Sequence, residues 1–208
     1  MRKFLLMILT LCMLSTGLVT FSACATPPRV GEVYDRVVEL IEASYELNTV
    51  FYGDGLPVWK TDSAYAEFSH LYYDFPYVGD YELVKPQAKF QSVNEIQIAA
   101  AKIYSEKYLE TALLPAAFDG LASDTAVTGA RYLEEKGALY LSTTNAFAIE
   151  GIPIYDYSTM KIVAIGKRDA CFVEIDYVLD IQPDVTYTAS IRIVRQDDGL
   201  WYLDSFTG

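Results

Sequence analysis

The strongest constraint on this chain is a series of alternating strands between Tyr157 and Phe206. Four segments rich in β-branched and aromatic residues follow one another, and short runs of Gly, Asp, Pro and Lys separate them. Such residues favour tight turns between antiparallel strands. The predicted strands are 157–166, 171–180, 185–194 and 200–206, with turns at 166–169, 182–184 and 197–199. A meander of this kind needs cover on one face, so the residues before it are expected to supply helices.

The second predicted strand shows which face is covered. Successive side chains of a strand point to opposite faces, so Cys171 shares a face with apolar residues, while Glu174 and Asp176 share the other. We expect the Cys171 face to be buried, with Cys171 serving as a small apolar side chain rather than a nucleophile. If the other face lined a closed pocket, desolvation would raise the pKa of Glu174 or Asp176, and that carboxylate could then act as a general base.

The first residues are typical of an export signal. Met1-Arg2-Lys3 precede an apolar run, Phe4–Phe21, and Ser22-Ala23-Cys24 follows it. This pattern resembles the bacterial lipobox, in which cleavage before the cysteine is accompanied by attachment of diacylglycerol to its thiol. Two alternatives stay open: secretory cleavage after Ala25, and an uncleaved anchor, since the apolar run could just span a bilayer.

The lipobox implies a membrane partner and a location. A lipid on Cys24 would hold the chain on the extracytoplasmic face of a bacterial cell membrane. The predicted organisation is a signal peptide at 1–23, a tether at 24–30 and a single α+β domain at 31–208. Its fold class is a curved antiparallel sheet packed against N-terminal helices.

Acidic residues dominate the chain and gather on its first helix. The formal net charge is −12 at pH 7, which disfavours nucleic acid and permits a basic partner. Residues 31–51 have helical apolar spacing. The inward face is predicted to hold Val33, Val37, Leu40, Ile41, Ser44, Leu47 and Asn48, and the opposite face carries Glu32, Asp35, Glu39, Glu42 and Glu46. Like charges at this spacing weaken a helix, so the stripe is either a solvated face or a docking surface for a basic partner.

Aromatic residues crowd the next segment, where ten of the residues from 51 to 81 are Phe, Trp or Tyr. Aromatic side chains bury large areas and carry polar tips. The segment either lines a binding cleft for a sugar, a peptide or an apolar group, or closes one end of the core. The candidate binding residues are Trp59, Phe68, His70, Tyr72 and Tyr73.

The middle of the chain is expected to alternate short elements. Ser92 and Glu95 form a capping-box pattern that starts a helix. The predicted order is a strand at 81–84, this helix, a second helix from Ser105 to Pro115, a loop at 119–128, two strands within 131–143 around a turn at 135–137, and a connection at 145–156.

The motifs of common enzymes are missing from the sequence. It holds no P-loop, no dinucleotide-binding glycine pattern, no nucleophile elbow and no HExxH. With His70 as the only histidine, no metal site and no cofactor are expected. We therefore predict a protein that is not an enzyme; the alternative is a small enzyme using His70, Glu174 or Asp176.

The end of the meander resembles a known fold. Asp198-Gly199-Leu200-Trp201, followed by Phe206, is similar to the last hairpin of NTF2-like domains. The resemblance implies a strongly curved sheet that wraps helices into an NTF2-like or cystatin-like cone.

A narrower resemblance covers more of the chain. Its motifs are Tyr81-x-x-Val84, Phe90-x-Ser92, Tyr104-Ser105, the segment 136–140 and Asp198-Gly199-x-Trp201. Together they resemble clostridial lipoproteins of the IseA type, which inhibit D,L-endopeptidases that cut peptidoglycan. The resemblance implies a surface lipoprotein that regulates or inhibits a cell-wall hydrolase, although no inhibitory residue is carried over. The acidic surface of the chain suits a basic hydrolase. The alternative without catalysis is a lipoprotein that carries a ligand in an aromatic cleft.

Overall fold

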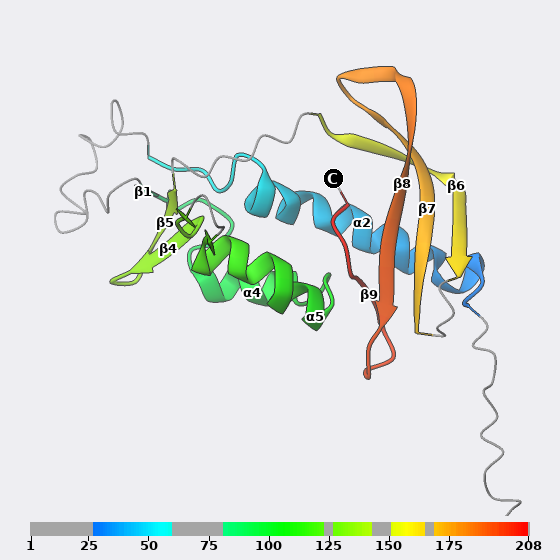
Figure 1. The fold of residues 1–208 in the computed structure, drawn as a ribbon. Helices are drawn as coiled ribbons and strands as arrows, with labels where there is room; N and C mark the ends of the chain where they lie inside the picture. The colour runs from blue at the N-terminus through cyan, green and yellow to red at the C-terminus, as the bar shows by residue number, and fades with distance from the viewer. Residues whose placement is uncertain (1–26, 60–80, 123–126, 143–150, 165–168, 208) are drawn as a thin grey trace, which may run out of the picture.

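The computed structural model describes residues 27–59, 81–122, 127–142, 151–164 and 169–207. These residues form a mixture of helices and antiparallel sheets, which confirms the α+β fold class. Figure 1 shows the long helix α2 (Val30–Tyr52) running from the largest sheet to a smaller sheet at its far end.

Helix α2 forms where its apolar spacing predicts. Each residue expected on its inward face is buried, including the polar Ser44 and Asn48. The last turn ends at Gly53, whose N–H donates to the carbonyl oxygens of Asn48 and Thr49, both at 3.1 Å. The buried Arg131 side chain adds a donor, because its Nε lies 2.8 Å from the carbonyl oxygen of Val50. A cation near the negative end of a helix dipole stabilises that end.

The predicted meander is confirmed as a four-stranded sheet. Its antiparallel strands β6 (Pro153–Ala164), β7 (Ala170–Leu179), β8 (Gln182–Arg195) and β9 (Trp201–Leu203) lie in sequence order. The expected face is buried, since the side chains of Cys171, Val173 and Ile175 are inaccessible to solvent. Gly199 has a positive φ of 82° in the turn before β9, where a glycine is favoured.

Two boundaries of the meander were predicted wrongly. Pro153–Asp156 belong to β6 rather than to a connection, and an irregularity between Asp156 and Lys161 separates them from the rest of the strand. Residues 182–184 belong to β8 rather than to a turn, because the chain reverses at Asp180 and Ile181 instead. Pro183 is tolerated there because the register with β7 shifts between Thr186 and Gln182, which leaves it without a ladder partner.

The smaller sheet has the order β1-β5-β4, from β1 (Tyr81–Leu83), β5 (Ala138–Ser142) and β4 (Tyr132–Glu135). The predicted turn between β4 and β5 is confirmed, and Lys136 and Gly137 have the positive φ values that a tight hairpin requires. Two short strands, β2 (Leu121–Ala122) and β3 (Val127–Thr128), pair where the sequence predicted only a loop.

Helix α4 (Val93–Ala100) begins at the predicted cap Ser92, and α5 (Glu106–Tyr108) begins after Ser105, where the second helix was predicted to start. The hydroxyl of Ser92 accepts from the Glu95 N–H at 3.2 Å. After α5 the chain continues through two π-helical turns, η2 (Leu109–Leu113) and η3 (Pro115–Asp119). The predicted stop at Pro115 is wrong, because a proline is acceptable in the first turn of a helical segment.

A buried polar cluster joins α2 to the segment that follows β9. The Asn48 amide nitrogen donates to the Thr207 hydroxyl at 2.9 Å, and the Tyr104 hydroxyl donates to the Asn48 amide oxygen at 2.9 Å. The hydroxyls of Thr207 and Ser44 lie 2.6 Å apart. Since Ser44 donates to the Ile41 carbonyl oxygen at 2.7 Å, Thr207 is the donor to Ser44. The side-chain polar atoms of this cluster therefore all have hydrogen-bond partners, so burying them carries little penalty in folding free energy.

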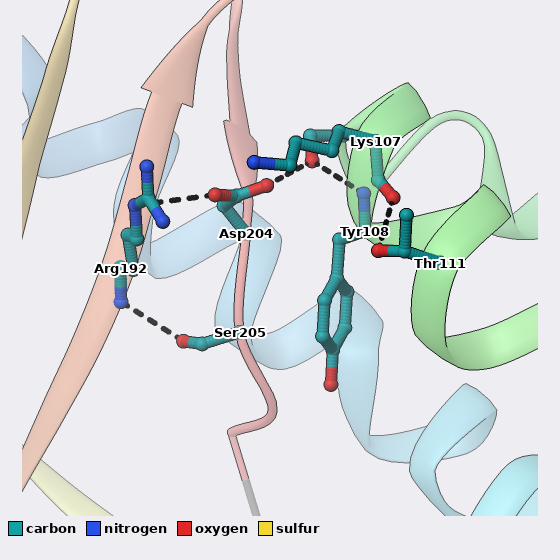
Figure 2. A network of polar contacts seen from close by, with 7 residues as sticks. Lys107, Tyr108, Thr111, Arg192, Asp204 and Ser205 are labelled. Carbon is teal, nitrogen blue, oxygen red and sulfur yellow. Dashed lines mark hydrogen bonds and ion pairs between the residues drawn. The ribbon is translucent and has the colours of Figure 1, made fainter.

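A second polar cluster fastens the helices to the sheet (Figure 2). Asp204 accepts a short hydrogen bond from the Ser105 hydroxyl and lies 3.2 Å from Nε of Arg192 on β8. The Ser205 hydroxyl accepts from the Arg192 N–H at 2.9 Å. The backbone repeats the link, because the Ser105 N–H donates to the Leu203 carbonyl oxygen at 2.8 Å.

Candidate functional site

The predicted acidic stripe is exposed along the outer side of α2. Asp35, Glu39, Glu42 and Glu46 are all accessible to solvent. Two of them pair within the chain: Glu39 lies 2.9 Å from Arg36, and Glu46 makes a short contact with Lys89. Exposed pairs of this kind contribute little to stability, about 0–1 kcal/mol each.

A groove of about 690 Å³ lies between α2 and α4, and the stripe forms one of its borders. Its apolar lining comes from both helices and from the residues beside α4: Leu40, Ala43, Leu47, Phe90, Ile98, Ala99 and Ile103. Ile98 is 53% exposed. It lies on α4, and the buried face of that helix is formed by Ile96 and Ala100. The groove therefore leaves apolar surface in contact with water.

Charged side chains of both signs surround this groove. Arg36, Lys89 and Lys102 supply cations, and Glu39, Glu46 and Glu95 supply carboxylates. Arg36 is fixed in place, because its Nε donates to the Trp201 carbonyl oxygen at 3.0 Å and its terminal nitrogen donates to the Lys102 carbonyl oxygen at 3.2 Å. An apolar floor inside a charged rim is the composition of a protein-binding surface.

Tyrosines form a second concentrated feature on the inner face of the large sheet. Tyr155, Tyr177 and Tyr187 lie directly opposite one another on β6, β7 and β8, with ring centroids 5.5 Å and 5.4 Å apart. We call these three residues the tyrosine row. Tyr45 of α2 stacks on Tyr155 at 6.5 Å. Burial raises the pKa of Tyr155, and the neighbouring Tyr45 hydroxyl raises it further, so the ring stays neutral at physiological pH.

A cleft of about 420 Å³ opens beside Tyr45, between α2 and the ends of β6 and β7. Ile152 and Ile181 line it and are 59% and 58% exposed. A hydrogen bond joins two sides of this cleft, because the Asp180 carboxylate accepts from the Ile152 backbone N–H at 2.7 Å. This cleft could not be predicted from the sequence, because it depends on the unpredicted first residues of β6.

The residues predicted for binding are only partly described. Cys24, Phe68, His70, Tyr72 and Tyr73 lie outside the described residues, as do the signal peptide and most of the aromatic segment.

Trp59 is the one predicted aromatic binding residue within the described part of the chain. It is half-buried beside β1, where its backbone N–H donates to the Leu83 carbonyl oxygen at 2.9 Å and Lys85 Nζ lies 5.2 Å from its ring centroid. Trp59 is not among the residues that line the groove or the cleft.

The carboxylates considered for catalysis lie on the outer face of β7. Glu174 and Asp176 line neither the groove nor the cleft. The Asp176 carboxylate accepts from the Thr188 hydroxyl at 2.7 Å. Cys171 lies on the opposite face, where burial raises the pKa of its thiol to about 11. Among the described residues, no group of three or more His, Cys, Asp or Glu side chains is placed to hold a metal ion.

No family model matches the chain, and neither the curated proteins nor the solved structures contain a significant match to it. Within the described ranges, no helix combines the length and the apolar character needed to cross a membrane.

Proposed function

We propose that this chain is a surface lipoprotein that binds another protein in the groove between α2 and α4 and performs no catalysis itself. Its partner is a basic cell-wall hydrolase, which it regulates or inhibits at the outer face of a bacterial membrane. The single observation that carries the proposal is the open apolar floor of the groove with Ile98 at its surface. The lipobox supplies the location, and the resemblance to IseA-type lipoproteins supplies the class of partner.

Charge favours a basic partner over an acidic one. The chain carries a net charge of −12, and complementary charge accelerates association and selects against partners of the wrong sign. Glu39 and Glu46 belong both to the acidic stripe and to the groove. The groove between two helices suits a helix or an extended segment that places apolar side chains against Ala43 and Ile98.

The finer description of the fold belongs to the same proposal. We propose that the four-stranded sheet, α2 and α4 form an NTF2-like or cystatin-like cone. Its support is the sequential antiparallel order of β6 to β9 and the closing Asp198-Gly199-x-Trp201 turn. In this arrangement the sheet is the scaffold, and the helical side carries the binding surface.

The test is inhibition of peptidoglycan cleavage. The purified full chain in mild detergent is added to bacterial D,L-endopeptidases, and the loss of turbidity of a cell-wall suspension is followed. We expect the wild type to slow cleavage and Ile98→Lys to lose at least tenfold in potency, because the substitution places a charge on the apolar floor. An undiminished cleavage rate with every endopeptidase tested would refute the choice of partner.

The matched control is Leu200→Lys. Leu200 is 52% exposed, close to the exposure of Ile98, but it lies in the turn before β9 and does not line the groove. This variant is expected to inhibit as well as the wild type. If both lysine variants weaken inhibition equally, added positive charge is responsible and the groove is not the binding site.

The cleft beside Tyr45 supports a second candidate, a lipoprotein that carries a small apolar or sugar ligand. The supporting observation is the combination of stacked tyrosines with the exposed Ile152 and Ile181. Native mass spectrometry of the gently extracted protein would detect such a ligand as added mass. Ile152→Asp should abolish that added mass, and an unliganded wild type would exclude this candidate.

A further inference from the structure

One edge of β8 is covered along only part of its length. β9 pairs with β8 at Ile193, Val194 and Arg195, and Asp204 and Ser205 extend the contact to Arg192. Beyond that point the chain leaves β8 and turns onto α2, where Thr207 is buried (Figure 1). Among the described residues, the stretch 186–190 of β8 therefore has a neighbouring strand only on the β7 side.

Hydrogen bonds at the covered end show which backbone groups face this open edge. The Arg192 carbonyl oxygen accepts from the Asp204 N–H at 2.8 Å, so the backbone of Arg192 faces β9. The Arg195 N–H donates to the Asp169 carbonyl oxygen at 2.7 Å, so odd-numbered residues face β7. Since direction alternates along a strand, the N–H and C=O groups of Thr186, Thr188 and Ser190 point outward, away from β7.

The same assignment follows from β7. Asp176 lies opposite Thr188 in the register, but its N–H donates across to the Thr159 hydroxyl on β6 at 2.8 Å. The pair of Asp176 and Thr188 is therefore one that exchanges no backbone hydrogen bonds. Thr186, Thr188 and Ser190 are all exposed.

The open edge lacks the features that normally prevent edge pairing. Residues 185–191 contain no charge, no proline and no glycine, and most are β-branched or aromatic. Proteins usually protect a free edge with lysine, proline or a bulge, because unpaired N–H and C=O groups attract another strand. Although the chain has a net charge of −12, residues 185–191 add no like charge of their own between two copies.

We propose that the β8 edges of two copies of this chain pair antiparallel about a twofold axis at Thr188, which joins their sheets into one continuous sheet. In this register Thr188 lies opposite the partner's Thr188, and Thr186 lies opposite the partner's Ser190. Each of these pairs exchanges two backbone hydrogen bonds. The interface is isologous, so the assembly closes as a dimer rather than extending into a fibre.

Side chains on both faces fit this register. On the inner face, Tyr187 at the end of the tyrosine row meets the partner's small Ala189, so the row gains a neighbour without a clash between two rings. On the outer face, threonine and serine side chains meet across the axis, which is a favourable cross-strand combination. The pairing is confined to residues 186–190, because Asp204 and Ser205 already cover the edge at Arg192.

Cysteine crosslinking tests the register in the full chain, purified in mild detergent. Paired residues of this kind have Cα atoms about 5.5 Å apart, which lies within the range that a disulfide bridges. We expect Thr188→Cys to form a disulfide-linked dimer under mild oxidation. Thr186→Cys and Ser190→Cys should each stay unlinked alone and link when the two variants are mixed. The wild type, treated identically, gives the background from the native cysteines.

The size of the protein in solution, measured by light scattering, tests the dimer itself. The wild type and Thr188→Ser should be dimeric, whereas Thr188→Lys should be monomeric because it places two cations opposite each other. An unchanged melting temperature shows that Thr188→Lys still folds. A monomeric wild type at its solubility limit, a Thr188→Lys dimer, or a Thr188→Cys variant without crosslinks would each overturn the proposal.

Discussion

Replacing Asp204 tests whether the cluster in Figure 2 holds the helices to the sheet. Its carboxylate accepts from the Ser105 hydroxyl, and Ser105 is only 1% exposed. Asp204→Ala removes that acceptor and the ion pair with Arg192. Asp204→Asn removes the charge but keeps an oxygen that accepts from Ser105. The two variants therefore separate the hydrogen bond from the ion pair.

The expected losses follow from the burial of each partner. A buried hydrogen bond to a charged group contributes about 1.5–3 kcal/mol. The Arg192 side chain is 34% exposed, so solvent screening limits the ion pair to about 0.5 kcal/mol. We expect Asp204→Ala to lower the free energy of unfolding by about 2–3.5 kcal/mol and Asp204→Asn to lower it by about 1 kcal/mol. For a chain of this size, the alanine variant should melt about 5–12 °C below the wild type.

Urea unfolding followed by circular dichroism measures both losses. Thr111→Ala is the control, because Thr111 is exposed and its hydroxyl donates only to the Lys107 carbonyl oxygen, at 2.7 Å. Its effect should stay within about 0.5 kcal/mol. Equal losses for Asp204→Ala and Asp204→Asn, or a loss below about 0.5 kcal/mol for the alanine variant, would refute the assigned role of the Ser105 hydrogen bond.

Three further predictions concern single side chains. Cys171 should resist alkylation in the native protein at neutral pH and react after unfolding, as peptide mass mapping would show. Its pKa is raised to about 11 in the folded protein. Its contribution to stability should therefore decline as the pH rises from the unfolded pKa, about 8.5, to 11. The Tyr202 hydroxyl lowers the pKa of Asp198 by donating to it at 2.6 Å, so Tyr202→Phe should raise that pKa towards its ordinary value in an NMR titration. Arg131→Met should destabilise the fold by about 3 kcal/mol in urea unfolding, since it removes the charged donor to the Val50 and Gly53 carbonyl oxygens, although the Tyr132 hydroxyl still donates to Val50. An unchanged midpoint would show that the buried charge costs as much as these bonds contribute.

Periodicity explains why the main elements could be predicted. The inward face of α2 was predicted residue by residue, because one face of a helix has a fixed spacing and each apolar position on it is buried. The alternation around Cys171 identified the buried face of β7 for the same reason. These patterns are local, and tertiary structure did not override them.

Features that depend on register or on distant packing could not be predicted. The tyrosine row requires Tyr155, Tyr177 and Tyr187 to lie at matching positions on three strands, and the shift near Gln182 was invisible in the sequence. The groove exists because α4 lies along α2, and no local pattern near Ile98 indicates that neighbour. The acidic stripe was identified from the sequence. The pairing of its Glu46 with Lys89 could not be predicted, because the two residues lie far apart in the sequence.

The contact between α2 and Thr207 implies that the core can close only after the last residues of the chain have been synthesised. Asn48 and Ser44 are synthesised about 160 residues before the hydroxyl that satisfies them. Until Thr207 is present, closing the inner face of α2 would leave the Asn48 amide nitrogen without its acceptor, and contacts this distant in sequence form slowly. We therefore expect a nascent chain lacking residues 204–207 to stay loosely packed and sensitive to protease. An exported chain with this arrangement would remain unfolded enough to cross a translocation channel and would become compact only on the far side.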